Sequence, residues 1–360
     1  MKGTLIRYVF SFILSAALPC VCRADDAVRY PTIKPCGFIQ GWAWYDKTAG
    51  AIHGEDFEIA RARFGIKGNF SANTDYLLLT EWGRLTYDDP ATLVDAWVNL
   101  KVNPALNIKI GQTWYKFSLS GSEAIPNIPF IYRPEVVDGI WLPMGRTGAY
   151  GYDRGIELWG DFKNSILPLG YVFSVTTGAG LDHFEDNGKK DFVGRLYIEP
   201  KKDLKLGMSG FYGYSRVSVV SNLLREEKVD LPEYAGGVDV SYKQKHFRVI
   251  YEYLEGLYEG YLDANAQETF QVATKRPRGW YGMFGFKPLS WIEIPVQYAW
   301  YEKDAVKSDT GLESITVGVT WFLKEGTLNN VKFNYIIRSA EPNYGSKPRN
   351  MLALQLQLVF

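Results

Sequence analysis

The last ten residues of the chain, Met351 to Phe360, read MLALQLQLVF. One parity of this stretch holds Leu352, Leu354, Leu356, Leu358 and Phe360, and the other holds Ala353, Gln355, Gln357 and Val359. Because successive side chains of a β-strand point to opposite faces, the stretch predicts a strand with one apolar and one largely polar face. Such a strand suits a soluble antiparallel sheet and a membrane barrel equally well, so the pattern alone leaves both classes open.

The same two-residue period recurs along the chain, with Ile292, Ile294 and Val296 opposing Glu293 and Gln297 as one instance. We expect about sixteen strands of about ten residues, an even number and a length that spans a membrane barrel. Their approximate limits are 37–46, 55–69, 74–86, 92–102, 106–117, 152–162, 169–177, 191–199, 204–216, 234–242, 247–259, 278–286, 292–301, 312–323, 330–338 and 350–360.

The connections between these strands alternate in length. The even-numbered connections are tight, as in Phe70 to Asn73 and Asn103 to Ala105. Most odd-numbered connections are long and rich in Gly, Pro and polar residues, and they comprise 118–151, 178–190, 217–233 and 260–277. Outer-membrane barrels have short periplasmic turns and long external loops, whereas a soluble sandwich has no reason to sort its loops by length. The sequence therefore predicts an all-β protein, a transmembrane antiparallel β-barrel in the outer membrane of a Gram-negative bacterium.

The composition agrees with a membrane barrel and excludes other classes. The 360 residues include 11 Trp, 24 Tyr and 20 Phe, and amphipathic aromatic side chains often mark a membrane interface. With 40 basic and 40 acidic residues the chain has no excess of positive charge for binding phosphate backbones, so no nucleic-acid partner is expected.

The first 24 residues are interpreted as a secretory signal. Lys2 and Arg7 precede an apolar run that is too short to span a membrane, and Cys22 to Ala24 fits a cleavage site. A membrane anchor and a lipid-modified Cys20 are alternatives. Residues 25–36 are expected to form a short periplasmic segment and residues 37–360 the barrel. Loss of the signal leaves 37 basic and 40 acidic residues, a net charge of −3.

A membrane barrel must close, because lipid cannot satisfy the backbone groups of a free strand edge. We expect the last strand to pair with the strand that begins at Gly37. The chain ends at Phe360, and a terminal aromatic residue on an alternating strand is a feature that the outer-membrane assembly machinery prefers. Outer-membrane lipid and this machinery are therefore expected partners.

Five segments resemble the phosphate-selective porin O and P family. They are 58–68 (EIARARFGIKG), 93–101 (LVDAWVNLK), 106–112 (LNIKIGQ), 117–120 (FSLS) and 152–156 (YDRGI). The resemblance implies a sixteen-stranded channel, usually a homotrimer, whose third external loop, here 118–151, folds into the lumen. It also implies that small hydrophilic solutes pass lumenal arginines and lysines, with anions such as phosphate or pyrophosphate as candidates. Many relatives have no established solute.

Strand parity selects candidate residues for the solute path. On the second strand Ala60, Ala62, Phe64 and Ile66 form the only plausible lipid face, which turns Arg61, Arg63 and Lys67 inward. A basic residue at the lipid midplane costs about 2–4 kcal/mol, and basic groups in a pore favour anions. The full set is Arg61, Arg63, Lys67, Lys101, Lys109, Arg133, Arg146, Arg154, Arg195, Arg248 and Arg338.

Acidic residues limit this interpretation. Asp95, Glu252 and Glu293 also face inward, and Glu123, Glu135 and Asp138 lie on the long loop. Two hypotheses remain: a dedicated anion path, or a wide pore of weak preference in which acids pair with the bases and stiffen loop and wall.

Other functional classes find less support. The three histidines, His53, His183 and His246, fall on separate connections, and after signal removal only Cys36 remains, so we expect no enzyme, no metal site and no cofactor. A surface binding or adhesion barrel is the main alternative, with 217–233 and 260–277 as its contact loops. Small adhesive barrels are plugged by side chains, whereas sixteen strands leave an aqueous lumen.

Overall fold

The structure is a computed structural model that describes residues 29–46, 55–83, 91–144, 151–163, 166–181, 184–185, 187–220, 226–262, 272–307, 310–339 and 349–360. The chain divides into Met1–Tyr30 and Pro31–Phe360, and the fold below belongs to the second unit. The expected signal segment lies outside the described residues.

The described residues form one antiparallel sheet of strands. Its members are β1 (Lys34–Asp46), β2 (Glu55–Ser71), β3 (Thr74–Glu81), β4 (Thr92–Asn103), β5 (Leu106–Trp114), β6 (Tyr152–Phe162), β7 (Leu169–Thr176), β8 (Asp191–Lys201), β9 (Leu204–Val220), β10 (Glu226–Lys243), β11 (Phe247–Leu262), β12 (Val272–Lys275), β13 (Arg278–Leu289), β14 (Ile292–Glu302), β15 (Gly311–Phe322), β16 (Asn330–Arg338) and β17 (Arg349–Val359). Both β12 and β13 pair with β11, so within the described residues seventeen segments occupy sixteen positions of the sheet. The predicted all-β barrel of sixteen strands is confirmed.

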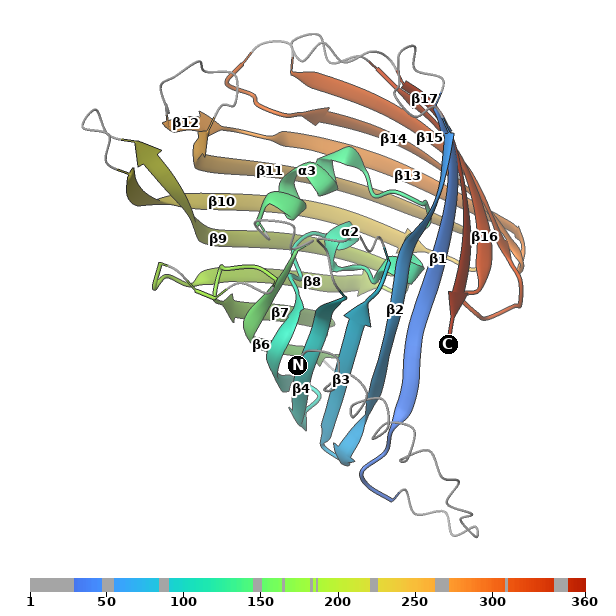
Figure 1. Cartoon of the computed structure of the whole chain (residues 1–360). Helices are drawn as coiled ribbons and strands as arrows, with labels where there is room; N and C mark the ends of the chain where they lie inside the picture. Colours follow the sequence, from blue (N-terminus) through green and yellow to red (C-terminus); the bar gives the residue numbers. More distant parts are fainter. Residues whose placement is uncertain are drawn as a thin grey trace, which may run out of the picture. The chain divides into compact units, whose positions relative to one another are not determined.

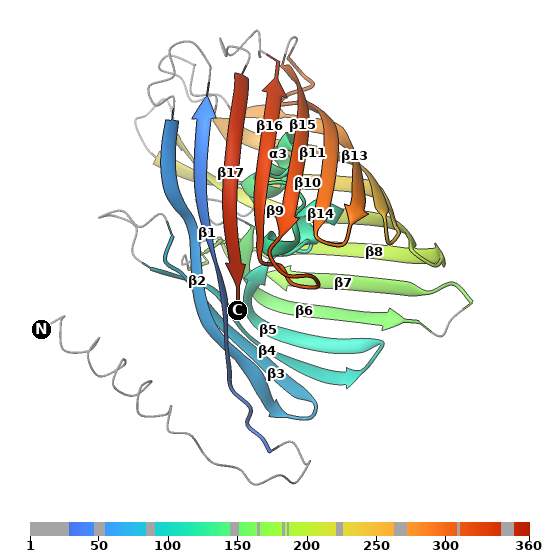
Figure 2. The same cartoon turned by 90° about the vertical axis from the view of Figure 1, so that its right-hand side faces the viewer.

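The sheet closes on itself where β17 pairs with β1, from Phe38 opposite Val359 to Asp46 opposite Met351 (Figure 2). Two backbone hydrogen bonds extend this pairing, since Gly37 and Phe360 each donate to the other's carbonyl oxygen over 3.1 Å. The ring of Phe360 also lies 5.6 Å from that of Phe64 on β2. The predicted pairing of the last strand with the first is therefore confirmed, and Phe360 lies at the seam.

Deleting Phe360 should lower the amount of folded protein in the outer membrane and leave unfolded chain in the periplasm. The deletion removes the last two hydrogen bonds of the seam and an aromatic pair worth about 0.5–1.5 kcal/mol. Immunoblots of membrane fractions would measure the effect, with Phe360→Tyr as the control that keeps a ring. Unchanged surface abundance of the deletion variant would contradict the role of Phe360 in assembly.

Alternation gives the sheet an apolar outer face and a mainly polar inner face. On β17 the side chains of Leu354, Leu356 and Leu358 are 42–47% exposed, whereas Gln355 and Gln357 are at most 1% exposed. Buried amides on one face and exposed leucines on the other are expected only where the exposed face meets lipid. The predicted faces of this strand are confirmed.

A β-bulge corrects the predicted parity of β2. The register against β1 shifts where Gln40 faces Arg61 and Gly41 faces Ile59, so Ala60 is the extra residue. Ala60 is 5% exposed and packs inside with Trp42, while Ile59 takes the outer face at 54% exposure. The prediction was right for Ala62, Phe64 and Ile66 but wrong for Ala60, because alternation continues only up to a bulge.

Three other expectations need correction. The predicted external loop 217–233 is largely strand, because β9 and β10 continue as a hairpin in which Val217 faces Val229. The expectation that aromatic side chains mark the membrane interface fails for Trp42, which is 6% exposed and whose ring lies 5.0 Å from that of Tyr132. The first strand begins at Lys34, three residues before the expected start.

The connection between β5 and β6 carries the helical turns of the fold. It contains α2 (Leu119–Ser122), the 3-10 helix η1 (Ile125–Asn127) and α3 (Glu135–Met144). Figure 1 draws α2 and α3 among the strands. Among the described residues no helix is long and apolar enough to cross a membrane.

Candidate functional site

The segment 115–144 is fixed to the inner face of the sheet by hydrogen bonds to its backbone. The Glu252 carboxylate accepts from the backbone N–H groups of Leu119 and Ser120, at the start of α2. Asn334 accepts from the N–H of Ile131 over 2.8 Å, and Lys332 donates to the carbonyl of Ile128 over 2.6 Å. Further bonds join Tyr258 to the carbonyl of Ile140, Ser314 to Glu135, and Gln357 to the carbonyl of Pro126.

An apolar cluster reinforces these bonds. Phe117, Val136, Val137 and Ile140 are completely buried. They pack against wall side chains that include Ile250, Leu254, Tyr281 and Met283. Burial of such a side chain contributes roughly 1.5–3 kcal/mol, so this cluster is a major part of what holds the segment. The inner face of the barrel is apolar at this cluster and polar at most other positions. This difference explains why α3 lies against β11, β13 and β14.

Arg133 acts as an internal brace of the segment. Its guanidinium donates to the backbone carbonyls of Ser120 and, over 2.9 Å, of Glu123. Ser118 caps α2 by accepting from the N–H of Gly121 over 2.8 Å. The contacts of Arg133 join parts of the segment that are ten or more residues apart, which favours a rigid element.

Five of the candidate bases are paired with acids of other strands, in three cases of the adjacent strand and in two cases across one intervening strand. The pairs and their shortest distances are Arg63–Glu81 at 2.7 Å, Lys101–Asp75 at 3.3 Å, Lys109–Glu157 at 2.5 Å, Arg195–Asp239 at 2.5 Å and Arg248–Glu293 at 2.5 Å. Arg63 also donates to the hydroxyl of Tyr152 over 2.6 Å. Paired bases present less net charge to a passing anion, so this arrangement matches the hypothesis of a stiffened polar wall.

The remaining candidates lie in different surroundings. Arg61 donates to Gln40 over 2.9 Å and lies 5.3 Å from the ring of Trp42. Lys67 is exposed on β2, and Arg338 is partly exposed near the end of β16. Arg154 shares the strand face of the exposed Ile156, and its guanidinium lies over Phe184, so it is not among the inner residues. Arg146 lies outside the described residues.

Lys116 is an additional basic residue that the strand parity did not identify. Lys116 follows β5 directly, and its Nζ lies 2.9 Å from the ring centroid of Trp114. Burial lowers the pKa of Lys116 to about 7, although Glu157 opposes this effect. Burial likewise raises the pKa of Asp138, on α3, to about 6, and Arg133 opposes that shift. No local motif marks Lys116, since its burial depends on contacts with distant residues.

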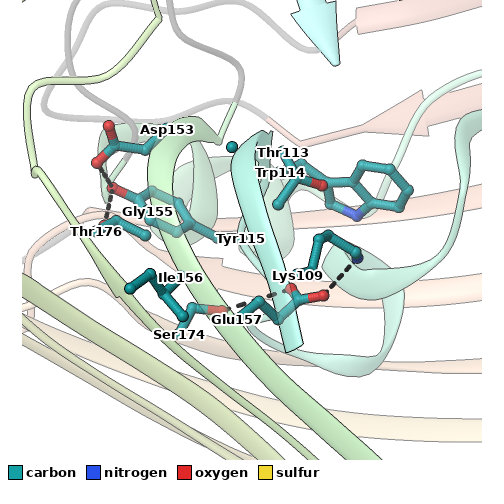
Figure 3. Close-up of a pocket in the computed structure, with 11 residues that line it drawn as sticks. Lys109, Thr113, Trp114, Tyr115, Asp153, Gly155, Ile156, Glu157, Ser174 and Thr176 are labelled. Carbon is teal, nitrogen blue, oxygen red and sulfur yellow. Dashed lines mark hydrogen bonds and ion pairs between the residues drawn. The ribbon is translucent and has the colours of Figure 1, made fainter. Parts of the chain in front are cut away.

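A polar cluster on the wall surrounds the start of the segment (Figure 3). Glu157 bonds to Lys109, and Ser174 lies 3.4 Å from its second oxygen. Beside them the Tyr115 hydroxyl donates to Asp153 over 3.0 Å. The cavity between these groups holds only about 10 Å³, at the lower limit of what one water molecule needs. This cluster therefore supports the wall and is not a binding pocket.

The described residues contain no group of three or more His, Cys, Asp or Glu side chains arranged to hold a metal ion. His246 lies at a short turn, 3.2 Å from the carbonyl of Lys287, while His53 and His183 fall outside the described part of the chain.

A closed barrel with a lipid-facing outer surface, a polar inner surface and a segment packed inside defines the class of outer-membrane porins. The family described as phosphate-selective porin O and P matches residues 40–182, which confirms the resemblance. No protein with a curated description matches the chain significantly.

Several solved structures of outer-membrane proteins share this fold. The anion-selective porin from Comamonas acidovorans shares 11% identity, with a TM-score of 0.66 over 92% of this chain and 100% of that one. OmpF of Salmonella typhi, in complex with daunomycin, shares 10% identity, with a TM-score of 0.64 over 91% and 97%. A trimer form of OmpT from Vibrio cholerae shares 12% identity, with a TM-score of 0.60 over 92% and 100%. At such low identity these likenesses establish the fold alone.

Proposed function

We propose that the chain is an outer-membrane porin whose water-filled lumen, narrowed by the segment 115–144, lets small hydrophilic solutes diffuse across the membrane. One observation carries this proposal: the segment buries Val136, Val137 and Ile140 against the wall, while Lys116, Arg133 and Asp138 keep partial exposure. A segment with one buried and one accessible side restricts a channel without filling it.

The proposed path runs past Arg61, Lys109, Lys116 and Arg133. The charges of these side chains influence common groups. Lys109 and Arg133 affect the pKa of Lys116, and Arg61 and Arg133 affect the pKa of Asp138. Nearby acids offset much of this charge. The pore should therefore prefer anions weakly, and a dedicated phosphate path is the less favoured alternative because five of the eleven candidate bases are already paired with acids.

The chain acts, in this proposal, as a channel and not as an enzyme, and as a homotrimer in outer-membrane lipid. A trimer form is known for the OmpT structure that shares this fold. Phe360 would be the residue that the assembly machinery reads, and the adhesion alternative is disfavoured because a packed constriction has no evident use in an adhesin.

Replacing Arg61 and Arg63 with Gln should shift the zero-current potential of planar-bilayer channels toward cations without closing the pore. Two positive charges are lost near the constriction, and the negative charge of Glu81 is no longer balanced by Arg63. Measurement under a salt gradient tests this, and Arg216→Gln, which breaks an ion pair with Asp230 on the external hairpin, is the matched control. An unchanged potential in the folded double variant would mean that lumenal acids already neutralise these arginines.

A further inference from the structure

A cavity of about 350 Å³ lies beside the segment, toward the short turns of the barrel. Its walls come from the part of the segment between Glu123 and Pro129, and from the short-turn ends of β11, β13, β14, β15 and β16. Because a water molecule occupies about 30 Å³ in the liquid, the cavity has room for a small organic molecule. Short turns lie on the periplasmic side of such barrels, so the cavity faces the exit of the channel.

Basic residues outnumber acidic residues in the lining of this cavity. Arg248, Lys287 and Lys332 line it, against Glu123 and Glu293. Glu293 is shared, at 2.5 Å from Arg248 and 3.6 Å from Lys287. Glu123 lies 3.8 Å from Lys243, a further base. An anion would therefore be attracted here, and the planar guanidinium of Arg248 still has N–H groups in addition to the one that meets Glu293.

About half of the uncharged lining residues are apolar, a feature that an inorganic anion would not require. Phe322, Leu328 and Ile128 contribute side chains, and Pro126 and Pro129 contribute rings. The ring of Phe322 lies 5.3 Å from the Nζ of Lys287, so a base and an aromatic face adjoin. A ligand that carries its charge at one end and an apolar body at the other fits this division.

A buried acceptor completes the lining. Asn330 is 1% exposed, and its amide nitrogen donates to the carbonyl of Leu328 over 2.7 Å. Its Oδ1 atom has no hydrogen-bond partner among the described residues. A buried acceptor without a donor is costly, which favours a ligand or water here that can donate.

From these contacts we infer that the cavity binds aromatic carboxylates, with the carboxylate at Arg248 and Lys287 and the ring against Phe322 and Leu328. This inference rests on the proposed function, because the site lies along the solute path of the porin. Aromatic carboxylates would be the class of solute that binds along this path. Phosphate has no apolar group that could contact the apolar half of this lining.

Channel block by benzoate tests the site. With the wild-type protein open in a planar bilayer in chloride, benzoate added on the short-turn side should reduce the current in a saturable way, whereas acetate at equal concentration should not. Lys287→Gln should raise the half-blocking concentration of benzoate about tenfold, which corresponds to about 1.4 kcal/mol. Lys287 lies near the end of β13 and its side chain is 37% exposed, so this variant is expected to fold. Phe322→Leu should weaken benzoate block as well, through loss of the ring.

The control is Lys201→Gln, which removes an exposed lysine outside the cavity lining and should leave the block as in the wild type. Absence of any chloride current would contradict the porin function itself. A normal chloride current with no benzoate block, equal block by acetate, or equal block in Lys287→Gln and Lys201→Gln would each overturn the carboxylate site and leave the porin function intact.

Discussion

Replacing the segment 117–149 with a short Gly-Ser turn should raise the single-channel conductance several-fold. The N–H of Tyr115 donates to the carbonyl of Gly151 over 2.6 Å, so the two strand ends are adjacent and a short turn can join them. The deletion removes both the side chains that narrow the lumen and the cluster around Val136 and Ile140 that fixes them to the wall.

Truncation of the external hairpin between Val217 and Val229 is the matched control for that deletion. This hairpin pairs only β9 with β10 beyond the barrel wall, so its loss should leave the conductance unchanged. Heat-modifiable electrophoretic mobility would verify that both variants are folded. If the folded segment deletion conducts like the wild type, the segment 115–144 is not the constriction.

The preference for anions should increase as the pH falls from 8 to 5. Lys116, with a pKa of about 7, is mostly neutral at pH 8 and charged at pH 5, and Asp138, with a pKa of about 6, is charged at pH 8 and neutral at pH 5. Both protonations make the lumen more positive, so their effects on the zero-current potential add. Ordinary exposed carboxylates stay ionised over most of this range.

Several charged groups lie near Lys116 and Asp138, so the pH experiment needs variants of these two residues as controls. Lys116 faces Glu157, Lys109, Asp95 and Arg133, and Asp138 faces Arg133, Arg61 and Glu135. The variants Lys116→Gln and Asp138→Asn should each remove part of the pH dependence, and the double variant most of it. A pH dependence that persists in the double variant would assign it to other groups, such as the histidines.

Strand limits and faces could be predicted because alternation is a local property. A barrel strand that meets lipid shows period two over its whole length, and β16, with Phe333 outside and Lys332 inside, is one such strand. The prediction failed where one extra residue interrupts the period, as at Ala60, and where a hairpin continues past the membrane, as at Val217. Neither feature has a sequence signal in a single chain.

The candidate site was less predictable than the fold. Parity showed that Arg63, Arg195 and Arg248 face inward, but not that each meets a carboxylate from another strand. The partners of the segment lie more than a hundred residues away, as with Leu119 and Glu252, so no spacing in the sequence records them. For the same reason the burial that shifts the pKa of Lys116 could not be foreseen.

Liposome swelling with sugars of increasing size tests the central claim most directly. Proteoliposomes that contain the purified, folded wild-type chain should swell rapidly in a pentose, more slowly in a disaccharide and scarcely in a tetrasaccharide, because the segment 115–144 narrows a water-filled lumen. Folded, heat-modifiable protein that produces no swelling even in the pentose would contradict the assignment of this chain as an outer-membrane channel for small solutes.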